Sequence, residues 1–186
     1  MRLYKSLLLL FAVIMTVACS SGKSEIITVE NGQFIKNGKP YYFIGTNMWY
    51  ATILASEGEG GDRERLSREL DSLKSIGIDN LRILVGADGD CSLPCKVEPM
   101  LQTAPGKYND TLLRGLDYLL VEMGKRDMQA VLYLNNSWEW SGGYSQYLTW
   151  AGYGKAPIPR IDGYSNFETF VGNYMTSIDM AGASLS

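Results

Sequence analysis

The sequence predicts an α/β fold in which a β-hairpin precedes a parallel sheet. Two observations predict it. Short apolar segments without polar alternation, typical of strands buried on both faces, alternate along the chain with amphipathic helical patterns. Near the start, an Asn-Gly pair separates two short strand-like runs. The 186 residues, of which 46% are hydrophobic and 20% charged, have an ordinary globular composition and the length of one domain.

The expected hairpin consists of two strands joined by Asn31-Gly32, a pair typical of a type I′ turn. These strands cover residues 26–29 and 33–35. A second Asn-Gly pair, Asn37-Gly38, leads into the first strand of the expected parallel sheet, at residues 41–45. That segment is apolar without alternation, which favours a strand buried on both faces.

The first helix is expected over residues 62–76. Asp62 can accept hydrogen bonds from the first turn, and Gly77 suits the left-handed conformation that ends many helices. Its apolar residues repeat at helical spacing, so they predict one buried stripe. The stripe consists of Leu66, Leu70, Leu73 and Ile76.

Two further strands and two further helices follow. The strands are expected at residues 80–85 and 130–134, which are apolar apart from the Asn80 and Arg82 side chains. The second helix begins at Asn109 or Asp110, and a capping box at residues 165–168 opens the third. The buried stripe of the second helix consists of Leu112, Leu113, Leu116, Leu119, Leu120 and Met123.

The composition excludes several classes of chemistry. The chain contains no histidine, so it holds no Ser-His-Asp triad, no Cys-His pair and no HExxH zinc site. The net charge of -3 gives no reason to expect a nucleic-acid partner. Residues 45–48, which follow the first expected strand, match neither GxGxxG nor a Walker motif. We therefore expect no nucleotide cofactor and no metal.

The N-terminus has the features of a leader segment. Arg2 and Lys5 precede an apolar run at residues 7–17, which is too short to span a bilayer, and Ala18 precedes Cys19. This arrangement resembles a bacterial lipoprotein signal, and a plain secretory signal is the alternative. We expect a signal peptide at residues 1–18, a tether at 19–25 and the folded domain at 26–186. Cys19 would carry the lipid and hold the protein at the cell envelope or surface.

Two more cysteines, Cys91 and Cys95, lie four positions apart in a loop. Outside the cytosol they could form a local disulfide, and two free thiols are the alternative. Two sulfur ligands without histidine do not make a zinc site.

Aromatic and amide side chains gather after the expected strands. In parallel α/β folds, functional residues lie in the loops at the carboxyl ends of the strands. Aromatic rings stack on the C–H faces of sugars, and amides bind hydroxyl groups, so these residues predict a saccharide cleft. Packing of long loops by large side chains is the alternative. The candidate binding residues are Trp49, Tyr50, Asn135, Asn136 and Trp138.

Charged residues near these strands have other interpretations. Arg82 lies within an apolar strand, so we expect a buried guanidinium paired with a carboxylate, and the alternative is an arginine that reaches solvent. Glu139 has no evident partner, and a retaining glycosidase needs two facing carboxyl groups, so Glu139 is interpreted as a hydrogen-bonding or surface residue. Asp88 and Asp90 are interpreted as loop-turn residues, and the alternative is that they bind sugar hydroxyls or a cation.

Three segments resemble glycoside hydrolase family 5, in particular its endo-β-1,4-mannanases and β-mannosidases. They are residues 34–50 (FIKNGKPYYFIGTNMWY), 77–84 (GIDNLRIL) and 133–150 (YLNNSWEWSGGYSQYLTW), in the order in which the family carries them. The last segment is the most specific. The resemblance extends from about residue 34 to about residue 174, which is most of the chain.

The resemblance implies a secreted (β/α)8 TIM barrel that hydrolyses β-1,4-mannosidic bonds in mannan, glucomannan or galactomannan. It implies a retaining mechanism with two glutamates and no cofactor. Arg82 would match the arginine that supports the nucleophile. The five candidate binding residues would lie in or near the glycone subsites, although the resemblance does not say whether Trp49 or Tyr50 stacks on the sugar.

The sequence departs from the family in one respect. The family's acid/base glutamate follows an asparagine after the fourth strand, and no Asn-Glu pair occurs in these 186 residues. Three core strands cannot close a barrel. We therefore expect an incomplete barrel with about three βα units and an N-terminal hairpin, without either catalytic glutamate and inactive alone. The alternatives are a non-catalytic glycan-binding lipoprotein of the cell surface and the product of a gene remnant.

Overall fold

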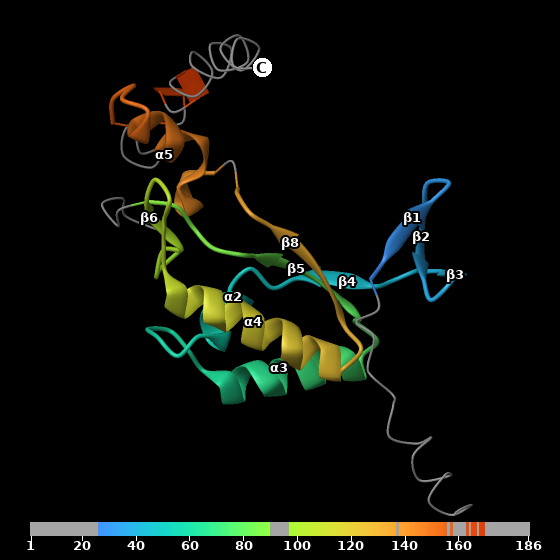
Figure 1. The fold of residues 1–186 in the computed structure, drawn as a ribbon. Helices are drawn as coiled ribbons and strands as arrows, with labels where there is room; N and C mark the ends of the chain where they lie inside the picture. Colours follow the sequence, from blue (N-terminus) through green and yellow to red (C-terminus); the bar gives the residue numbers. More distant parts are fainter. Residues whose placement is uncertain are drawn as a thin grey trace, which may run out of the picture. The chain divides into compact units, whose positions relative to one another are not determined.

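The computed structural model describes residues 26–89, 97–136 and 138–155, and the isolated positions 157, 163, 165–166 and 168–169. The chain forms two compact units, residues 1–42 and 43–186, and each is described separately below (Figure 1). The expected leader with Cys19, the Cys91–Cys95 pair, Asp90 and most of the third expected helix lie outside the described residues. These predictions are therefore not tested by the structure.

The first unit contains the predicted hairpin. Strand β1 (Thr28–Glu30) pairs antiparallel with β2 (Gln33–Lys36), which pairs in turn with β3 (Lys39–Pro40). Asn31 and Gly32 in the first turn have φ angles of 51° and 79°, and the Asn-Gly pair in the second turn also has positive φ angles. Positive φ at both central positions is the condition for a type I′ turn, so the predicted turn is confirmed.

The second unit is built on a parallel sheet with the strand order β4 (Gly45–Asn47), β5 (Asn80–Leu84) and β8 (Gln129–Tyr133). The first strand was expected at residues 41–45, and this prediction is wrong by several positions. Parallel pairing begins only where Gly45 lies opposite Asn80. The residues before Gly45 are not paired in this sheet, and Ile44 is 63% exposed.

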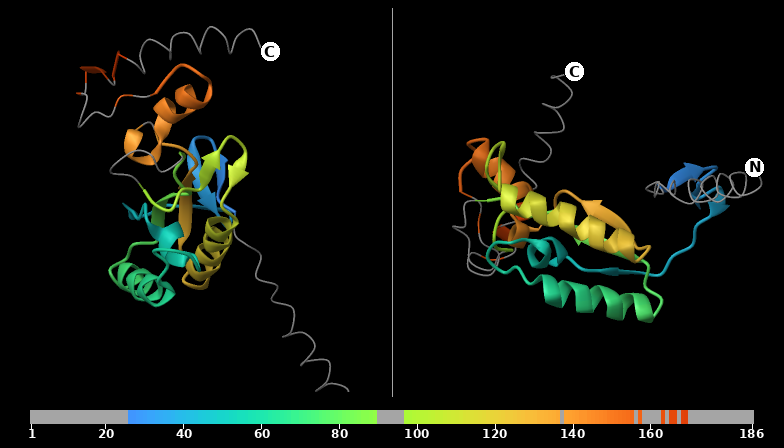
Figure 2. Two further views of the ribbon diagram at one scale, coloured as in Figure 1. Left: turned by 90° about the vertical axis from the view of Figure 1, so that its left-hand side faces the viewer. Right: turned by 60° about the horizontal axis from the view of Figure 1, so that its bottom comes forward.

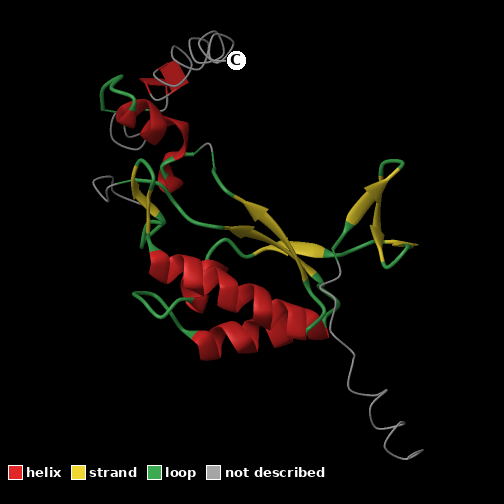
Figure 3. Cartoon of the chain, viewed as in Figure 1, coloured by secondary structure: helices red, strands yellow, loops and turns green. Residues whose placement is uncertain are grey.

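Three helices, α2 (Ala51–Ala55), α3 (Arg63–Ser75) and α4 (Asp110–Lys125), lie on one side of this sheet (Figures 1 and 3). The predicted caps are confirmed. Asp62 accepts a hydrogen bond of 2.8 Å from the Arg65 amide, and Asn109 caps α4. Ile76 was expected in the buried stripe of α3, but it is 74% exposed because the helix ends at Ser75.

The turned views in Figure 2 show the helices on one side of the sheet. The buried residues of the main cluster come from both layers, so the core lies between them. Of the expected stripe on α4, Leu112, Leu119 and Met123 are buried, while Leu113 and Leu120 are exposed at the edge of the helix. The main cluster of buried residues includes Met48, Leu54, Leu66, Leu70, Leu81, Ile83, Leu119 and Met123.

Besides β3 and α2, four short elements were not predicted. They are β6 (Gln102–Ala104), β7 (Lys107–Tyr108), the 3-10 helix η1 (Glu139–Ser141) and α5 (Gly143–Trp150). All four belong to the loops that follow β5 and β8. No helix in the described part of the chain is long and apolar enough to cross a membrane.

The second face of the sheet is open. Both faces were expected to be buried, but Arg82 and Val131 are exposed at paired positions on this face. Among the described residues, helices cover only the opposite face. A cavity of about 300 Å³ therefore lies over the open face, lined by Phe43, Gly45, Thr46, Asn47, Asn80, Arg82 and Val131.

Two glycines of α4 provide a matched test of the helix packing. A Cβ atom at Gly115 would lie 2.9 Å from the backbone of both Thr52 and Ser56 on the α2 side, whereas one at Gly124 would meet nothing within 4 Å. We expect Gly115→Ala to lower the free energy of unfolding by about 1–3 kcal/mol through overpacking. Gly124→Ala should raise it by up to about 1 kcal/mol, because alanine favours the helix.

Urea denaturation of the two variants and the parent chain measures both effects. Equal stability of Gly115→Ala and Gly124→Ala would contradict a close approach of α2 and α4.

Candidate functional site

The candidate site lies in the loops at the carboxyl ends of the parallel strands. Trp49 and Tyr50 follow β4, and Asn135, Asn136 and Trp138 follow β8. The Trp49 ring packs edge to face on Trp140, with centroids 6.2 Å apart. Because Trp140 belongs to the loop after β8, this contact joins the first and third loops of the sheet. Trp49 is 43% exposed, so part of its indole ring is accessible.

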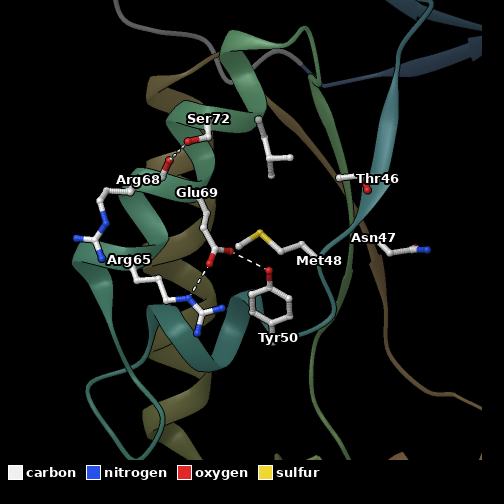
Figure 4. Close-up of a pocket in the computed structure, with 9 residues that line it drawn as sticks. Thr46, Asn47, Met48, Tyr50, Arg65, Arg68, Glu69 and Ser72 are labelled. Carbon is white, nitrogen blue, oxygen red and sulfur yellow. Dashed lines mark hydrogen bonds and ion pairs between the residues drawn. The ribbon is translucent and has the colours of Figure 1, made fainter.

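Tyr50 is turned toward helix α3. Its hydroxyl donates a hydrogen bond of 2.8 Å to Glu69 Oε2, and Arg65 donates one of 2.6 Å to the other oxygen of the same carboxylate (Figure 4). The pKa of Tyr50 is raised, first by burial and then by its hydrogen bond with Glu69. Because this hydroxyl is already occupied, the structure favours Trp49 over Tyr50 as the accessible aromatic group.

A cavity of about 380 Å³ lies beside Tyr50, Arg65 and Glu69, between β4 and α3. Figure 4 shows Tyr50, Glu69, Arg65 and Arg68 around it. The contacts in it connect the loop after β4 to α3, so the cavity belongs to the side of the sheet that carries the helices.

Asn135 belongs to a polar group that we call the Asp88 cluster, formed by Asp88, Gln102, Asn135 and Tyr147. Asn135 Nδ2 donates to Asp88 Oδ2 at 3.1 Å, and Gln102 Nε2 donates to Asp88 Oδ1 at 2.9 Å. Gln102 Nε2 also donates to the Tyr147 hydroxyl at 3.2 Å. The four side chains come from the loop after β5, from β6, from the loop after β8 and from α5.

Backbone contacts hold these segments together. The amide of Asp88 donates to the Ser141 carbonyl at 3.0 Å, and Gly89 donates to the Gln102 carbonyl at 2.9 Å. Gly142 has a φ angle of 88°, and a Cβ atom there would lie only 2.0 Å from the Asp88 carbonyl oxygen. A glycine is therefore required at this crossing.

Burial raises the pKa of the Asp88 carboxyl, and hydrogen bonds from Gln102 and Tyr147 oppose that shift. The pKa of Tyr147 is raised as well, first by burial and then by the negative charge of Asp88. Asp88 was interpreted as a loop residue, but its side chain is buried and central to the site. Sequence reasoning found Asn135 and missed the contribution of Gln102, because no periodic pattern marks β6.

The other two candidates do not join this cluster. Asn136 is half-buried and Trp138 is 50% exposed, and no described hydrogen bond connects either side chain to Asp88. Glu139, next to Trp138, has one carboxylate oxygen that is buried without a hydrogen-bond partner in the described chain. In the described part of the chain, no three His, Cys, Asp or Glu side chains are grouped closely enough to hold a metal ion.

Arg82 does not have the environment expected of it. Its side chain is exposed on the open face of the sheet, and among the described residues no carboxylate forms an ion pair with it. The expected buried ion pair is therefore wrong for this structure. The guanidinium lies 3.8 Å from the ring centroid of Tyr133, on the neighbouring strand. A cation–π contact holds it in place without a counter-charge.

The raised pKa of Asp88 predicts a change of stability with pH. Between the ordinary value of 3.8 and the higher value in the folded protein, the native state holds a proton that the unfolded chain has lost. The carboxyl therefore stabilises the fold at low pH, and this contribution is lost as the pH rises through that window. Asp88→Asn cannot titrate, so the parent should lose stability relative to this variant as the pH rises.

Urea denaturation of both proteins from about pH 3 to pH 7 measures this difference. Asp71, whose pKa is lowered by Arg126, and Glu122, whose pKa is lowered by Lys125 and Arg126, act with the opposite sign. They are present in both proteins and cancel in the comparison. A difference in stability that does not change with pH would contradict the proposed burial of the Asp88 carboxyl.

Comparison with known proteins identifies similar enzymes. Mannan endo-1,4-beta-mannosidase 1 of Arabidopsis thaliana is 28% identical over 134 residues, which cover 72% of this chain and 31% of that protein. Mannan endo-1,4-beta-mannosidase 5 of Solanum lycopersicum is 27% identical over 184 residues, which cover 94% of this chain and 41% of that protein. The chain thus spans between about a third and two fifths of the length of these curated relatives.

Solved structures agree with these relatives. The glycoside hydrolase family 5 mannosidase from Rhizomucor miehei is 33% identical, with a TM-score of 0.76 over 86% of this chain and 40% of that one. A mutant of it was solved in complex with mannosyl-fructose and matches at 32% identity with the same TM-score. The endo-1,4-beta-mannanase from Rhizomucor miehei is 20% identical with a TM-score of 0.54, which supports the fold alone.

These structures are TIM-barrel enzymes, so they confirm the fold class: the parallel strands and helices of the second unit form part of a (β/α)8 barrel. A family model described as GH family 5 beta-mannosidase-like matches residues 24–183. The family resemblance of the three sequence segments is therefore confirmed, and the chain belongs to the β-mannosidase-like group of glycoside hydrolase family 5.

Proposed function

We propose that this chain supplies part of the saccharide groove of a retaining glycoside hydrolase that acts on β-1,4-mannosidic bonds. The substrates are mannan, glucomannan or galactomannan. The observation that carries the proposal is that exposed aromatic rings and half-buried amide groups follow the carboxyl ends of the parallel strands in a member of this family. In barrels of this type, substrates bind at that end of the strands.

The geometry supports a binding role for Trp49. Its indole ring is partly exposed and is fixed in orientation by edge-to-face contacts with Tyr50 and Trp140, at centroid distances of 5.4 and 6.2 Å. A ring that is held by its neighbours loses little conformational freedom when a ligand stacks on it. Trp138, which is half exposed, is proposed as a second aromatic contact, and Asn135 and Asn136 as amide contacts to hydroxyl groups.

The similarity to a mannosidase that was solved with mannosyl-fructose supports a mannose-containing ligand. Arg82 is proposed to support the catalytic nucleophile, as the family resemblance implies. Its contact with Tyr133 keeps a positive charge over the open face of the sheet. Retaining hydrolysis requires two carboxyl groups about 5–5.5 Å apart on either side of the bond. No Asn-Glu pair is present in these residues, so we expect this chain alone to bind sugar without cleaving it.

The leader supports a proposed location outside the cytoplasm. The basic start, the short apolar run and Cys19 after Ala18 fit a lipoprotein with a signal peptide at 1–18 and a tether at 19–25. Acyl chains on Cys19 would hold the groove at a membrane surface, where it meets polysaccharide outside the cell.

Binding to mannan tests the proposed function. The purified chain should be retarded in affinity electrophoresis through gels that contain galactomannan. Trp49→Ala should weaken this binding about tenfold or more, which corresponds to ~1.4 kcal/mol. Tyr50→Phe is the matched control: it should bind like the parent and lose about 0.5–1.5 kcal/mol of stability with its hydrogen bond to Glu69. Equal retardation of Trp49→Ala and the parent would contradict the proposed role of Trp49.

Hydrolysis is measured separately by the release of reducing ends from the same galactomannan. We expect no sustained release by these residues alone, because the family mechanism requires both glutamates. Sustained turnover would overturn this part of the proposal, whereas binding without turnover by any longer form of the protein would favour the non-catalytic glycan-binding alternative.

The anchor is tested by mass spectrometry of the protein made in a bacterial host. The mature N-terminus should be Cys19 with attached acyl chains, and Cys19→Ser should lack them. Cys91→Ser is the control and should remain acylated. An unmodified N-terminus in the parent would indicate a plain secretory signal.

A further inference from the structure

The Asp88 cluster links a buried carboxylate to one of the proposed sugar-binding amides. Asp88 is 5% exposed and contacts Asn135, 47 positions later in the chain, through a hydrogen bond of 3.1 Å. An ionised carboxylate only accepts hydrogen bonds. The side of the Asn135 amide that faces Asp88 must therefore be its NH2 group, because its carbonyl oxygen has no proton to donate.

The second oxygen of Asp88 accepts a hydrogen bond from Gln102, whose amide is bonded through both its nitrogen and its oxygen. Its two N–H groups go to Asp88 at 2.9 Å and to the Tyr147 hydroxyl at 3.2 Å. Its carbonyl oxygen accepts from the Gly106 amide at 2.9 Å. Gln102 cannot turn its amide without losing all three contacts. It therefore keeps Asp88 in one orientation, and Asp88 in turn orients Asn135.

This arrangement leaves Asn135 Oδ1 as the group available to a ligand. The amide nitrogen of Asn135 faces Asp88, and the hydrogen bond from Asn135 also affects the pKa of the Tyr147 hydroxyl, which places the nitrogen beside both groups. No residue in the described part of the chain donates a hydrogen bond to Asn135 Oδ1. That oxygen can only accept, so it suits a hydroxyl group that donates.

We propose that Asp88 is a positioning residue that fixes the amide of Asn135, so that its Oδ1 atom accepts a hydrogen bond from a sugar hydroxyl. This inference rests on the proposed function for its ligand, but the orientation of the amide does not depend on the ligand. The physical reason is that the buried carboxylate can only accept hydrogen bonds, so the amide beside it must present its NH2 group. Asp88 touches no ligand itself and acts through Asn135.

The substitution Asp88→Asn tests this chain of contacts. Gln102 still requires an acceptor, so the carbonyl of the introduced amide faces Gln102 and its NH2 group faces Asn135. The Asn135 amide then has to turn over and presents NH2 to the ligand. We expect binding of mannohexaose to weaken about fivefold to tenfold, measured by titration calorimetry.

The double substitution Asp88→Asn with Asn135→Asp restores the pairing with its polarity reversed. The amide introduced at position 88 donates to the carboxylate introduced at position 135, whose other oxygen remains an acceptor for the ligand. We expect this double variant to bind within about threefold of the parent, while Asn135→Asp alone, with two facing carboxylates, binds more weakly than either. Asp117→Asn, at an exposed position of α4, is the control for the loss of one negative charge and should bind like the parent.

A readout without ligand separates this inference from the proposed function. In 15N NMR spectra, the side-chain amide signals of Asn135 should shift with pH as the Asp88 carboxyl titrates above its ordinary value of 3.8, and Asp88→Asn should abolish the shift. Tyr147 is the titratable group that contacts Asp88, and the other contacting side chains, Gln102 and Asn135, are neutral. Its titration lies far above this range.

The outcomes are distinct. The positioning role is wrong if the Asn135 amide signals do not shift as Asp88 titrates. It is also wrong if the double variant binds no better than Asn135→Asp alone. If the parent does not bind mannohexaose, the proposed function fails, and the amide titration still decides whether Asp88 orients Asn135. A loss of binding in Asp88→Asn that follows only its unfolding would overturn the inference in favour of a structural role.

Discussion

The parallel pairing of β4, β5 and β8 is the constraint on which the rest of this structure depends. Because the strands run in the same direction, each connection must cross back over the sheet, and the loops that follow the strands meet at one edge. Paired positions align Asn47 with Arg82 and Arg82 with Val131. The loops therefore leave the sheet close together, and residues far apart in the sequence, such as Trp49 and Trp140, come into contact.

The two faces of this sheet differ in what covers them. Helices α2 and α4 approach closely on one face, which a glycine at position 115 permits, and the core lies beneath them. The other face carries Arg82 and Val131 and is not covered by any described element. In a barrel of this family, that face looks toward the barrel axis, so its exposed residues belong to an interior that the described chain forms only in part.

Much of the fold could be predicted from the sequence where neighbouring residues determine it. The Asn-Gly turns and the caps at Asp62 and Asn109 depend on groups within a few positions, and they form as expected. The start of β4 depends on its pairing with β5, and the exposure of Arg82 depends on which elements cover it. Neither is encoded locally, so both predictions failed.

In the candidate site, the sequence marked some residues and not others. Trp49 and Asn135 could be named as candidates because residue type and position after a strand are both visible in the sequence. Asp88 and Gln102 acquire their role through contacts across 14 and 47 positions, which no local pattern reveals. The sequence did not distinguish Tyr50 from Trp49 as the stacking residue, because the hydrogen bond from the Tyr50 hydroxyl to Glu69 on α3 depends on the fold. The family resemblance identified the family to which the chain belongs.

The contact between Trp49 and Trp140 has an optical consequence. Two indole rings with centroids 6.2 Å apart and planes inclined by 69° are close enough for their electronic transitions to couple. Such coupling gives a paired positive and negative band in circular dichroism, whose strength depends on the separation and angle of the rings. The strength of this band therefore reports the distance between the first and third loops without an added dye.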